Sequence, residues 1–279
     1  MDEAGALLTN PLKARLARGE IVASMTVRLV ADPAIALLAR SAGFDSIYVD
    51  LEHGPFSIET AARICVAAQQ AGLAPLVRVP GHGAEWIARA LDGGAMGVIV
   101  PHVDTAEEAR RVVAAAKYPP LGHRSAAGAL PQLEFRAIPA ARAMPAVDAA
   151  TMVVVQAETA RGIDAIDDIM AVDGVDMVLL GANDLLADLG APGDFDDPRL
   201  MDAYARTIAA CLRNGKHAGI GGLAGRPDLV ARCVALGARY VSTGTDLGFL
   251  LDAATRRARD AHALAPGASQ APAPGATTA

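Results

Sequence analysis

The chain has 279 residues, of which 52% are hydrophobic, and a formal net charge of −6. This length allows one large α/β domain, and the negative balance excludes a basic face for nucleic acid. No apolar run approaches the ~18 residues of a membrane span, so we expect no membrane association. Asp2 and Glu3 precede any apolar stretch, which argues against a signal peptide and favours the cytoplasm.

Apolar strands and helical patterns alternate along the chain. Asp32-Pro33 and the capping box Thr105-Ala106-Glu107-Glu108 mark helix starts. The predicted strands cover residues 21–27, 45–50, 75–79, 97–101, 152–158, 176–181, 217–221 and 239–243. The predicted helices cover residues 11–18, 33–42, 58–71, 85–92, a segment opening at 105, and segments near 161–171, 197–214, 227–236 and 246–263. Eight strands, each followed by a helix, predict an α/β fold of the (β/α)₈ TIM-barrel type.

Two segments depart from this period. Residues 118–150 form a long connection with a helical piece, and loops of this length are commonly lids or interface elements. Residues 265–279 contain only small, polar or Pro residues and no charge. We therefore expect a single barrel domain over residues 1–264, followed by a disordered tail over 265–279.

Three cysteines, Cys65, Cys211 and Cys233, lie far apart within apolar helical patterns. An odd number at such spacing favours reduced core thiols over disulfides or a zinc site. The cysteines therefore indicate a reducing compartment.

A charged cluster, Asp50-Leu51-Glu52-His53, ends the second predicted strand just before Gly54-Pro55 stops regular structure. Parallel barrels bind ligands at the carboxyl ends of their strands. His53 is therefore either a loop histidine bonded to backbone or a general acid/base. Arg78 lies in an otherwise apolar strand, so it either pairs with a core acid or holds a substrate carboxylate with its planar guanidinium.

Further polar residues follow the fifth and sixth predicted strands, namely Gln156, Glu158, Asn183 and Asp184. Successive strands bring Glu158 and Asp184 close together, and two anions in a partly dry cavity call for a cation between them. An all-oxygen site suits Mg²⁺ or Mn²⁺. The alternative is that each acid caps the helix that follows it.

Other features of this rim leave alternatives open. Glycines after the seventh and eighth strands, at 219–222 and 243–245, suit a phosphate site or simply tight turns. His102 follows the fourth strand and has no evident partner. Lys13, Lys117 and Lys216 do not fall at a predicted strand end on this rim, which disfavours Schiff-base chemistry and leaves a metal as the electron sink.

Six segments in this order resemble the HpcH/HpaI aldolase family, over roughly residues 10–260. They are Asp50-Leu51-Glu52-His53-Gly54-Pro55, Val77-Arg78-Val79-Pro80, Val100-Pro101, Lys117-Tyr118-Pro119-Pro120-Leu121-Gly122, Val155-Gln156-Ala157-Glu158-Thr159 and Leu180-Gly181-Ala182-Asn183-Asp184-Leu185. Such enzymes are class II, metal-dependent pyruvate aldolases, for example 4-hydroxy-2-oxoheptane-1,7-dioate aldolase and 2-dehydro-3-deoxyglucarate aldolase. Their fold is a barrel of the phosphoenolpyruvate/pyruvate-binding type.

The resemblance assigns roles to individual residues. It implies that Glu158 and Asp184 bind a divalent cation, either Mg²⁺, Mn²⁺ or Co²⁺. Arg78 becomes the group that binds the pyruvate carboxylate and keto oxygen. His53 becomes the acid/base, with Asp92 as its orienting partner.

The resemblance also implies the remaining site residues, Gln156, Gly181, Ala182 and Asn183, as parts of the substrate pocket. The implied reaction is the reversible cleavage of a 4-hydroxy-2-oxo acid into pyruvate, or a close 2-oxo acid, and an aldehyde through a metal-stabilised enolate. A homohexamer is implied as well, in which neighbouring subunits help to close each site.

Two departures from the family pattern leave the aldehyde unpredicted. Gly181-Ala182-Asn183-Asp184 stands where members often have a Pro in second place, and Ser125-Ala126-Ala127-Gly128 lacks a small hydroxyl residue near its end. One alternative function is an acyl-CoA lyase related to citrate lyase, which would need a basic channel for the nucleotide. The other is a barrel that binds a 2-oxo acid without converting it.

Overall fold

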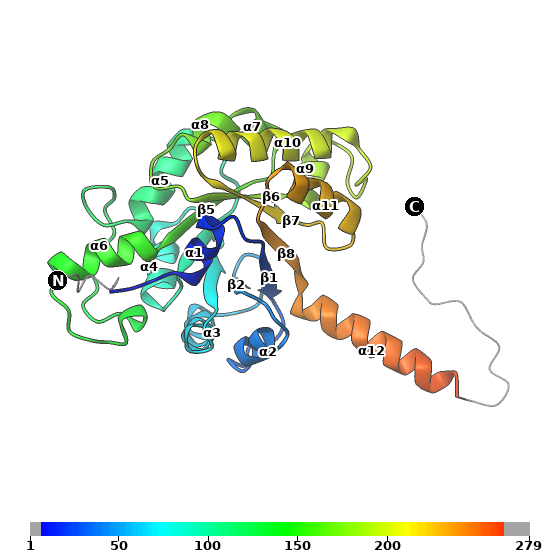
Figure 1. Cartoon of the computed structure of the whole chain (residues 1–279), viewed down its shortest axis with the longest axis horizontal. Helices are drawn as coiled ribbons and strands as arrows, with labels where there is room; N and C mark the ends of the chain where they lie inside the picture. Colours follow the sequence, from blue (N-terminus) through cyan, green and yellow to red (C-terminus); the bar gives the residue numbers. More distant parts are fainter. Residues whose placement is uncertain (1–6, 265–279) are drawn as a thin grey trace.

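A computed structural model describes residues 7–264, which form a closed barrel of eight parallel strands in the order β1 to β8 (Figure 1). The strands are β1 (Val22–Val27), β2 (Ser46–Asp50), β3 (Ala74–Arg78), β4 (Gly97–Val100), β5 (Met152–Ala157), β6 (Met177–Gly181), β7 (His217–Gly221) and β8 (Tyr240–Thr245). The predicted TIM-barrel fold is confirmed. The expected disordered tail, 265–279, lies outside the described residues.

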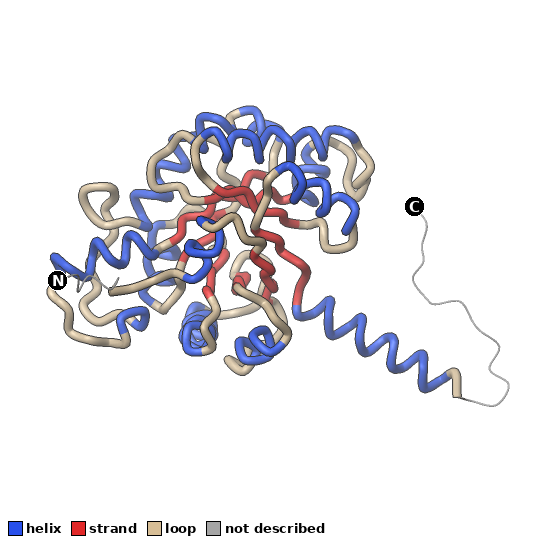
Figure 2. Tube along the Cα trace, in the orientation of Figure 1, coloured by secondary structure: helices blue, strands red, loops and turns tan. Residues whose placement is uncertain are grey.

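Helices alternate with the strands and surround the barrel (Figure 2). They are α1 (Pro11–Ala17), α2 (Ile35–Ser41), α3 (Ile58–Gln70), α4 (Ala84–Asp92), α5 (Ala106–Ala116), α6 (Ala140–Ala150), α7 (Ala160–Asp164), α8 (Ile166–Met170), α9 (Ala182–Asp188), α10 (Pro198–Arg213), α11 (Pro227–Leu236) and α12 (Asp246–His262). The predicted helix near 161–171 is in fact two short helices that meet at Ala165. The sequence analysis missed α9, which starts directly after β6.

Side chains at the starts of several helices explain where those helices begin. Asn10 accepts hydrogen bonds from the backbone N–H groups of α1, while Ser57 and Thr105 do the same for α3 and α5. These caps satisfy N–H groups that have no partner within the helix. The predicted capping box at Thr105 therefore forms a true helix start.

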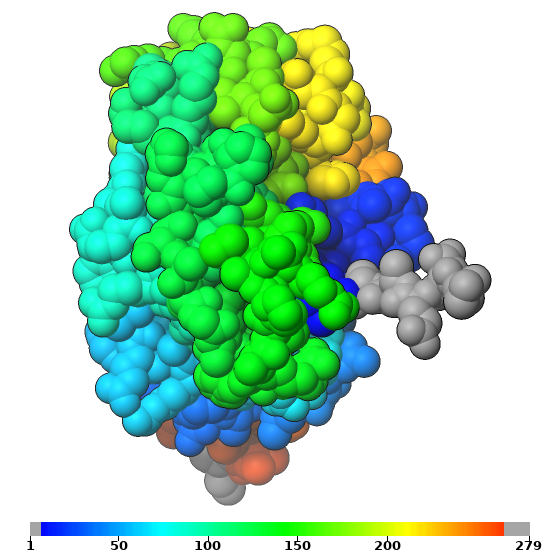
Figure 3. Space-filling model, turned by 90° about the vertical axis from the view of Figure 1, so that its left-hand side faces the viewer, coloured from blue at the N-terminus to red at the C-terminus, as the bar shows by residue number. Residues whose placement is uncertain are grey.

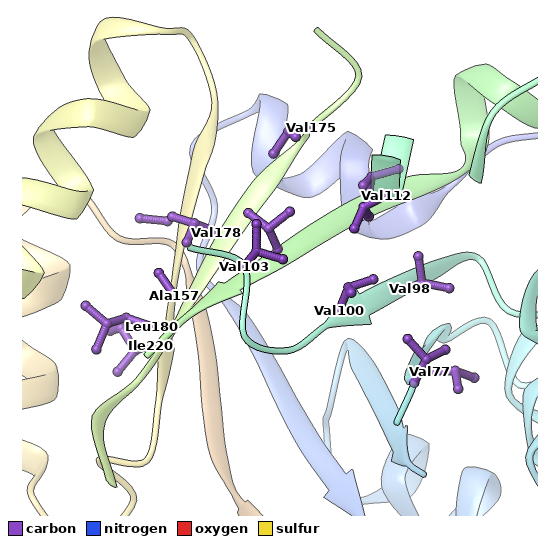
Figure 4. Close-up of a cluster of buried hydrophobic side chains, with 14 of the residues drawn as sticks. Val77, Val98, Val100, Val103, Val112, Ala157, Val175, Val178, Leu180 and Ile220 are labelled. Carbon is purple, nitrogen blue, oxygen red and sulfur yellow. The ribbon is translucent and has the colours of Figure 1, made fainter. Parts of the chain in front are cut away.

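The core has two layers, one inside the barrel and one between the barrel and its helices. Alternate strand residues such as Leu76, Ile99 and Val154 point inward, and Leu12 and Leu16 of α1 belong to the same inner cluster. The other residues of each strand point outward and pack against the helices. Figure 4 shows part of this outer layer, where Val77, Val98 and Val100 lie near side chains of neighbouring segments. This alternation decides which side chains reach the mouth of the barrel.

The connection between α5 and β5 lies at the amino end of the barrel. Gln132 donates to the backbone oxygens of Leu91 and Ala95, which precede β4. Lys117 donates to the backbone oxygens of Asp148 and Thr151, just before β5. Figure 3 shows this segment in green, where it forms much of one face of the molecule. It is therefore not a lid over the carboxyl end of its own barrel.

The last helix, α12, departs from a regular barrel because it does not lie flat along β8 and β1. It extends away from the body of the molecule (Figure 1), anchored at its start by Phe249, which stacks on Phe44. Leu247, Leu250 and Leu251 of α12 are exposed, Leu251 to 61%. An apolar helix face exposed in this way is typical of a surface that another chain covers.

The start of α12 is also tied to the loop after β1 through a buried carboxylate. Asp246 accepts hydrogen bonds from the backbone N–H groups of Arg28, Leu29 and Val30, and from that of Leu247. These bonds to a charged acceptor fix the backbone of the β1–α2 loop.

Two of the simpler sequence predictions can be compared directly with the structure. Cys65, Cys211 and Cys233 are free and buried, so the predicted core thiols are confirmed. Burial raises the pKa of Cys65 and of Cys211 to about 12, which keeps both thiols protonated. Among the described residues, none of the helices is long and apolar enough to cross a membrane.

Candidate active site

The register between β2 and β3 creates a buried ion pair at the carboxyl end of the barrel. Asp50 and Arg78 are direct partners in the ladder, and both side chains point inward. Arg78 Nε lies 3.0 Å from Asp50 Oδ1, and Nη2 lies 2.7 Å from Oδ2. The planar fork of the arginine thus binds the carboxylate with two parallel hydrogen bonds. Arg78 therefore does pair with a core acid.

The Asp50 carboxylate also shapes the turn that follows β2. Its Oδ1 accepts the backbone N–H groups of Glu52 and His53, at 3.1 and 3.2 Å. Gly54 completes the turn, because a Cβ there would lie 2.1 Å from the backbone oxygen of Asp50. One buried acid thereby sets the positions of both Glu52 and His53.

The two partners of the pair hold each other in their charged forms. Burial alone would raise the pKa of Asp50, but the hydrogen bonds and charge of Arg78 outweigh it and hold this pKa below its ordinary value. Burial likewise opposes the charge of Arg78, whose pKa is nevertheless raised by Asp50. The pair is therefore ionised at neutral pH.

A second acidic group lies next to this pair. Glu52 Oε2 is 2.9 Å from Arg78 Nη1, and Glu52 Oε1 is 3.3 Å from His102 Nε2. His102 Nδ1 is 3.0 Å from Glu158 Oε1, which also accepts the backbone N–H of His102 at 2.8 Å. His102 has a φ of 54°, the left-handed region, and this conformation turns its backbone N–H toward Glu158. His102 therefore connects two acids from opposite sides of the cluster.

The Glu158 carboxylate lies in a tight cradle. Gln156 donates from Nε2 to Glu158 Oε2, and a Cβ at Gly181 would lie 2.6 Å from the same oxygen. Only glycine at position 181 leaves room for the carboxylate. Burial raises the pKa of Glu158, with smaller opposing contributions from Gln156 and His102. A buried acid with this shift favours a nearby positive charge.

The donor atoms around Glu158 fit a divalent cation. Glu52, His102 and Glu158 each offer a ligand atom, and these atoms all lie within 4.8 Å of one another. The Oε1 of Gln156 is buried and, within residues 7–264, has no hydrogen-bond partner. Carboxylate and amide oxygens with one imidazole match Mg²⁺, Mn²⁺ or Co²⁺ better than a soft metal.

Arg78, which contacts Glu52, also lines a cavity of about 580 Å³ at the carboxyl end of the barrel. Its lining combines the ion pair, the catalytic candidates and the ends of the last two strands, and includes Arg28, Asp50, His53, Arg78, Asn183, Asp184, Gly222, Ser242, Thr243, Gly244 and Asp252. The side chain of His53 is 48% exposed, and its Nε2 lies 3.8 Å from Glu52 Oε2. A substrate in the cavity can therefore reach His53 and Arg78 together.

The other predicted site residues lie in three different places: at the cavity, against Glu158 or in the outer core. Asn183 and Asp184 line the same cavity from the first turn of α9. Gln156 and Gly181 contact Glu158 and so belong to the site. The side chain of Ala182 is buried in the outer core, so only its backbone is available to a substrate.

Two predicted contacts are not among those that the structure shows within one chain. Asp184 does not belong to the cluster of close ligand atoms, in which Glu158 is joined by Glu52 and His102. Asp92 does not orient His53 within one chain. It lies at the end of α4, near the amino end of the barrel, where it accepts a 2.7 Å hydrogen bond from Arg124.

The sequence analysis gave no role to Glu52, Arg28 or His102. The alternation of strand residues could have indicated the first two. Glu52 continues the inward series of β2, two residues after Asp50. Arg28 continues the series of β1, two residues after the buried Thr26. His102 follows an irregular turn with a positive φ, so no simple period predicts its direction.

The comparison with known proteins now decides the family. The family model described as HpcH/HpaI aldolase/citrate lyase matches residues 25–253. The chain belongs to this family. The resemblance inferred from the six motifs is thereby confirmed, and the site described above lies within the matched region.

Relatives at 34–40% identity are named as aldolases. The 4-hydroxy-4-methyl-2-oxoglutarate aldolase of Chaetomium globosum is 40% identical over 222 residues, which are 79% of this chain and 82% of that protein. The 2-keto-3-deoxy-L-rhamnonate aldolase of Escherichia coli is 34% identical over 252 residues, or 90% of this chain and 93% of that protein. Membership of an enzyme family of aldehyde-lyases follows.

Solved structures agree with this assignment. An HpcH/HpaI aldolase from Desulfitobacterium hafniense superposes with a TM-score of 0.86 and 30% identity, covering 94% of this chain and all of that one. A citrate lyase beta subunit from Mycobacterium tuberculosis, solved with oxaloacetate and magnesium, gives a TM-score of 0.54 and 18% identity, covering 82% of this chain and 92% of that one. The second likeness shows only a shared fold.

The Asp50–Arg78 pair gives a testable dependence of stability on pH. Asp50→Asn should lower the free energy of unfolding at pH 7 by about 3 kcal/mol, because it leaves a buried guanidinium with only Glu52 opposite. Since the folded-state pKa of Asp50 is lowered, its contribution is present above its unfolded pKa of about 3.9 and is lost as pH falls through the lower folded value. Urea unfolding measured from pH 7 down to pH 3 checks this.

The matched control is Asp260→Asn, at an exposed position of α12. This variant should stay within about 0.5 kcal/mol of the native protein. A gap between Asp50→Asn and the native protein that does not shrink at low pH would contradict the assignment of a stabilising ion pair.

Proposed function

We propose that the protein is a divalent-cation-dependent aldolase that reversibly cleaves a 4-hydroxy-2-oxo acid into pyruvate, or a close 2-oxo acid, and an aldehyde or ketone. The observation that carries the proposal is the buried Glu158 carboxylate in a cluster of oxygen and imidazole donors beside Arg78. Two relatives are named as aldolases of 4-hydroxy-4-methyl-2-oxoglutarate, which is such an acid with a second carboxylate.

The cation would be held by Glu158, with Asp184, which lines the cavity from the first turn of α9, as the second acid. When bound, Mg²⁺, Mn²⁺ or Co²⁺ would polarise the keto group of the 2-oxo acid and so supply the electron sink. A lysine does not supply it, because Lys13, Lys117 and Lys216 contact residues of the amino end instead. A Schiff base with any of these lysines would form away from the cavity.

Arg78 would bind the carboxylate of the 2-oxo acid. Its contacts with Asp50 and Glu52 fix the guanidinium but leave N–H donors unused, and Arg78 lines the cavity. A fixed guanidinium binds a carboxylate without a further loss of side-chain freedom. Two functions of Arg78, the structural pair and the substrate contact, are therefore compatible.

His53 would move the proton. In the cleavage direction, its imidazole removes the proton of the 4-hydroxyl group, and a carbonyl forms at that carbon. The bond between carbons 3 and 4 breaks, its electron pair passes to the pyruvate half, and carbon 3 is then protonated. Glu52, whose Oε2 lies 3.8 Å from His53 Nε2, stabilises the imidazolium that forms.

The ligand set of the cation can be tested apart from turnover. We expect Glu158→Gln and Asp184→Asn each to weaken Mn²⁺ binding at least tenfold, a usual loss for a ligand or its direct support. His102→Ala should weaken it less than either substitution, because the two acids keep the negative charge that holds the cation. Mn²⁺ titration followed by electron paramagnetic resonance measures these affinities.

Glu59→Gln, at an exposed position of α3, is the control for the loss of one carboxylate. If Mn²⁺ binding depends on His102 and Glu52 but not on Asp184, these two residues bind the cation together with Glu158. The assignment of Asp184 as a ligand is then wrong.

The activity predicts a specific pattern in a pyruvate-release assay over a panel of 4-hydroxy-2-oxo acids. EDTA should abolish release, and Mg²⁺, Mn²⁺ or Co²⁺ should restore it. His53→Ala should lower kcat by about 10²- to 10⁴-fold, the usual contribution of a general acid/base. Arg78→Lys should not restore the activity lost in Arg78→Ala, since an ammonium lacks the planar fork.

The control is Arg63→Met, on the exposed face of α3, which should keep native activity. Release that persists in EDTA would contradict the cation-dependent mechanism. No release from any acid in the panel would favour a barrel that binds a 2-oxo acid without converting it. The acyl-CoA lyase alternative has no comparable support, because the likeness to citrate lyase is one of fold.

The assembly is proposed as a homo-oligomer, in keeping with the hexamer that the family resemblance implies. The exposed leucines of α12 support it. Light scattering should give a multiple of 28.5 kDa, and Leu251→Glu should shift the mass toward one chain. A native monomer at micromolar concentration would contradict the proposal.

The free, buried thiols support a location in the cytoplasm.

A further inference from the structure

Arg28 brings a second guanidinium to the mouth of the cavity. Its Nε lies 3.3 Å from Asp50 Oδ2, and its Nη2 donates to the backbone oxygen of His53 at 3.3 Å. The side chain is 37% exposed and lines the cavity together with His53 and Arg78. Arg28 is thus next to the reacting groups without being buried among them.

Arg78 and Arg28 differ in how far nearby carboxylates balance their positive charge. Arg78 faces the carboxylates of both Asp50 and Glu52 at hydrogen-bond distance. Arg28 has only a longer contact with Asp50 Oδ2, an oxygen that already accepts a 2.7 Å hydrogen bond from Arg78. Arg28 therefore presents positive charge to the cavity that its neighbours do not fully balance.

Backbone groups near Arg28 cannot take the place of its side chain in binding an anion. The Asp246 carboxylate already accepts the backbone N–H groups of the β1–α2 loop and that of Leu247. Thr245 Oγ1 accepts the N–H of Gly248 in the same turn. A phosphate at the glycines of residues 243–245 would thus compete with Asp246 and Thr245 for the N–H groups of the next turn, whereas the Arg28 side chain extends from a backbone that Asp246 holds in place.

We propose that Arg28 binds a carboxylate on the carbonyl half of the substrate, so that the enzyme prefers 4-hydroxy-2-oxo diacids. This proposal rests on the proposed aldolase function. One planar guanidinium matches one planar carboxylate. A phosphate dianion would fit less well, because Asp184 and Asp252 also line the cavity. At about 580 Å³ the cavity has room for a five-carbon diacid, and Arg78 and Arg28 both line it.

A pair of probes with the same carbon skeleton isolates the distal carboxylate. We compare the binding of 2-oxoglutarate and 2-oxovalerate, which differ at the fifth carbon by a carboxylate in place of a methyl group. Isothermal titration in the presence of Mg²⁺ should show 2-oxoglutarate binding about 10- to 100-fold more tightly to the native protein, the range expected for a charge-assisted hydrogen bond. Arg28→Met should remove this preference, and Arg28→Lys should retain part of it.

Arg63→Met is the matched control and should keep the full preference. Its arginine is exposed on α3 and pairs with Glu59 away from the cavity. Circular dichroism and the unfolding midpoint show whether Arg28→Met is folded, which we expect because Asp246 is bound by backbone N–H groups that the substitution retains. Equal binding of the two acids by the native protein, binding of neither, or a preference that survives in Arg28→Met would overturn the proposal.

The same preference for a second carboxylate can be measured as a ratio of rates in the direction of synthesis. With pyruvate as donor, the ratio of kcat/KM for glyoxylate to kcat/KM for acetaldehyde should fall about 10- to 100-fold in Arg28→Met. A variant that slows both acceptors by the same factor would make Arg28 a general contributor and refute its role in selecting a diacid. If no acceptor reacts with the native protein, the aldolase function fails, and the binding comparison still decides the role of Arg28.

Discussion

The site depends on a buried ion pair between Asp50 and Arg78, set by the register of β2 and β3. The Asp50 carboxylate binds the guanidinium, accepts the backbone N–H groups of the turn that carries His53, and contacts Arg28. Because a shift of one residue in the register would put the two side chains on opposite faces of the sheet, the barrel itself holds the pair together. The acid/base candidate His53 and the two arginines of the cavity, Arg28 and Arg78, are therefore all positioned around the Asp50 carboxylate.

Two groups of charges meet around Arg78. Glu52, His102 and Glu158 form an acidic cluster that suits a divalent cation, and Glu52 contacts Arg78. Arg28 follows β1 and adds positive charge beside Asp50. Arg78 and Arg28 line the same cavity, so a diacid bound there could contact both. The arrangement thus explains both how the reaction could be promoted and why one class of substrate would be favoured.

Much of this was predictable because barrel strands follow a simple period. Apolar runs and helix caps predicted the fold, and the polar strand ends predicted His53, Arg78 and Glu158. The role of Glu52 was missed although it follows the alternation of β2, and that of His102 was missed because its direction depends on an irregular turn after β4. Asp92 ends α4 at the amino end of its own barrel, so its predicted contact with His53 is not made within one chain. The course of α12 depends on contacts that a single sequence does not encode locally.

The central claim is that Glu158 holds a cation beside Arg78, within reach of a bound 2-oxo acid. Crystals grown with Mn²⁺ and pyruvate, measured for anomalous scattering at the manganese edge, test it directly. The account predicts an anomalous peak at coordination distance from the Glu158 carboxylate, with the pyruvate carboxylate facing Arg78. A peak outside the cavity, or pyruvate bound away from Arg78, would contradict it.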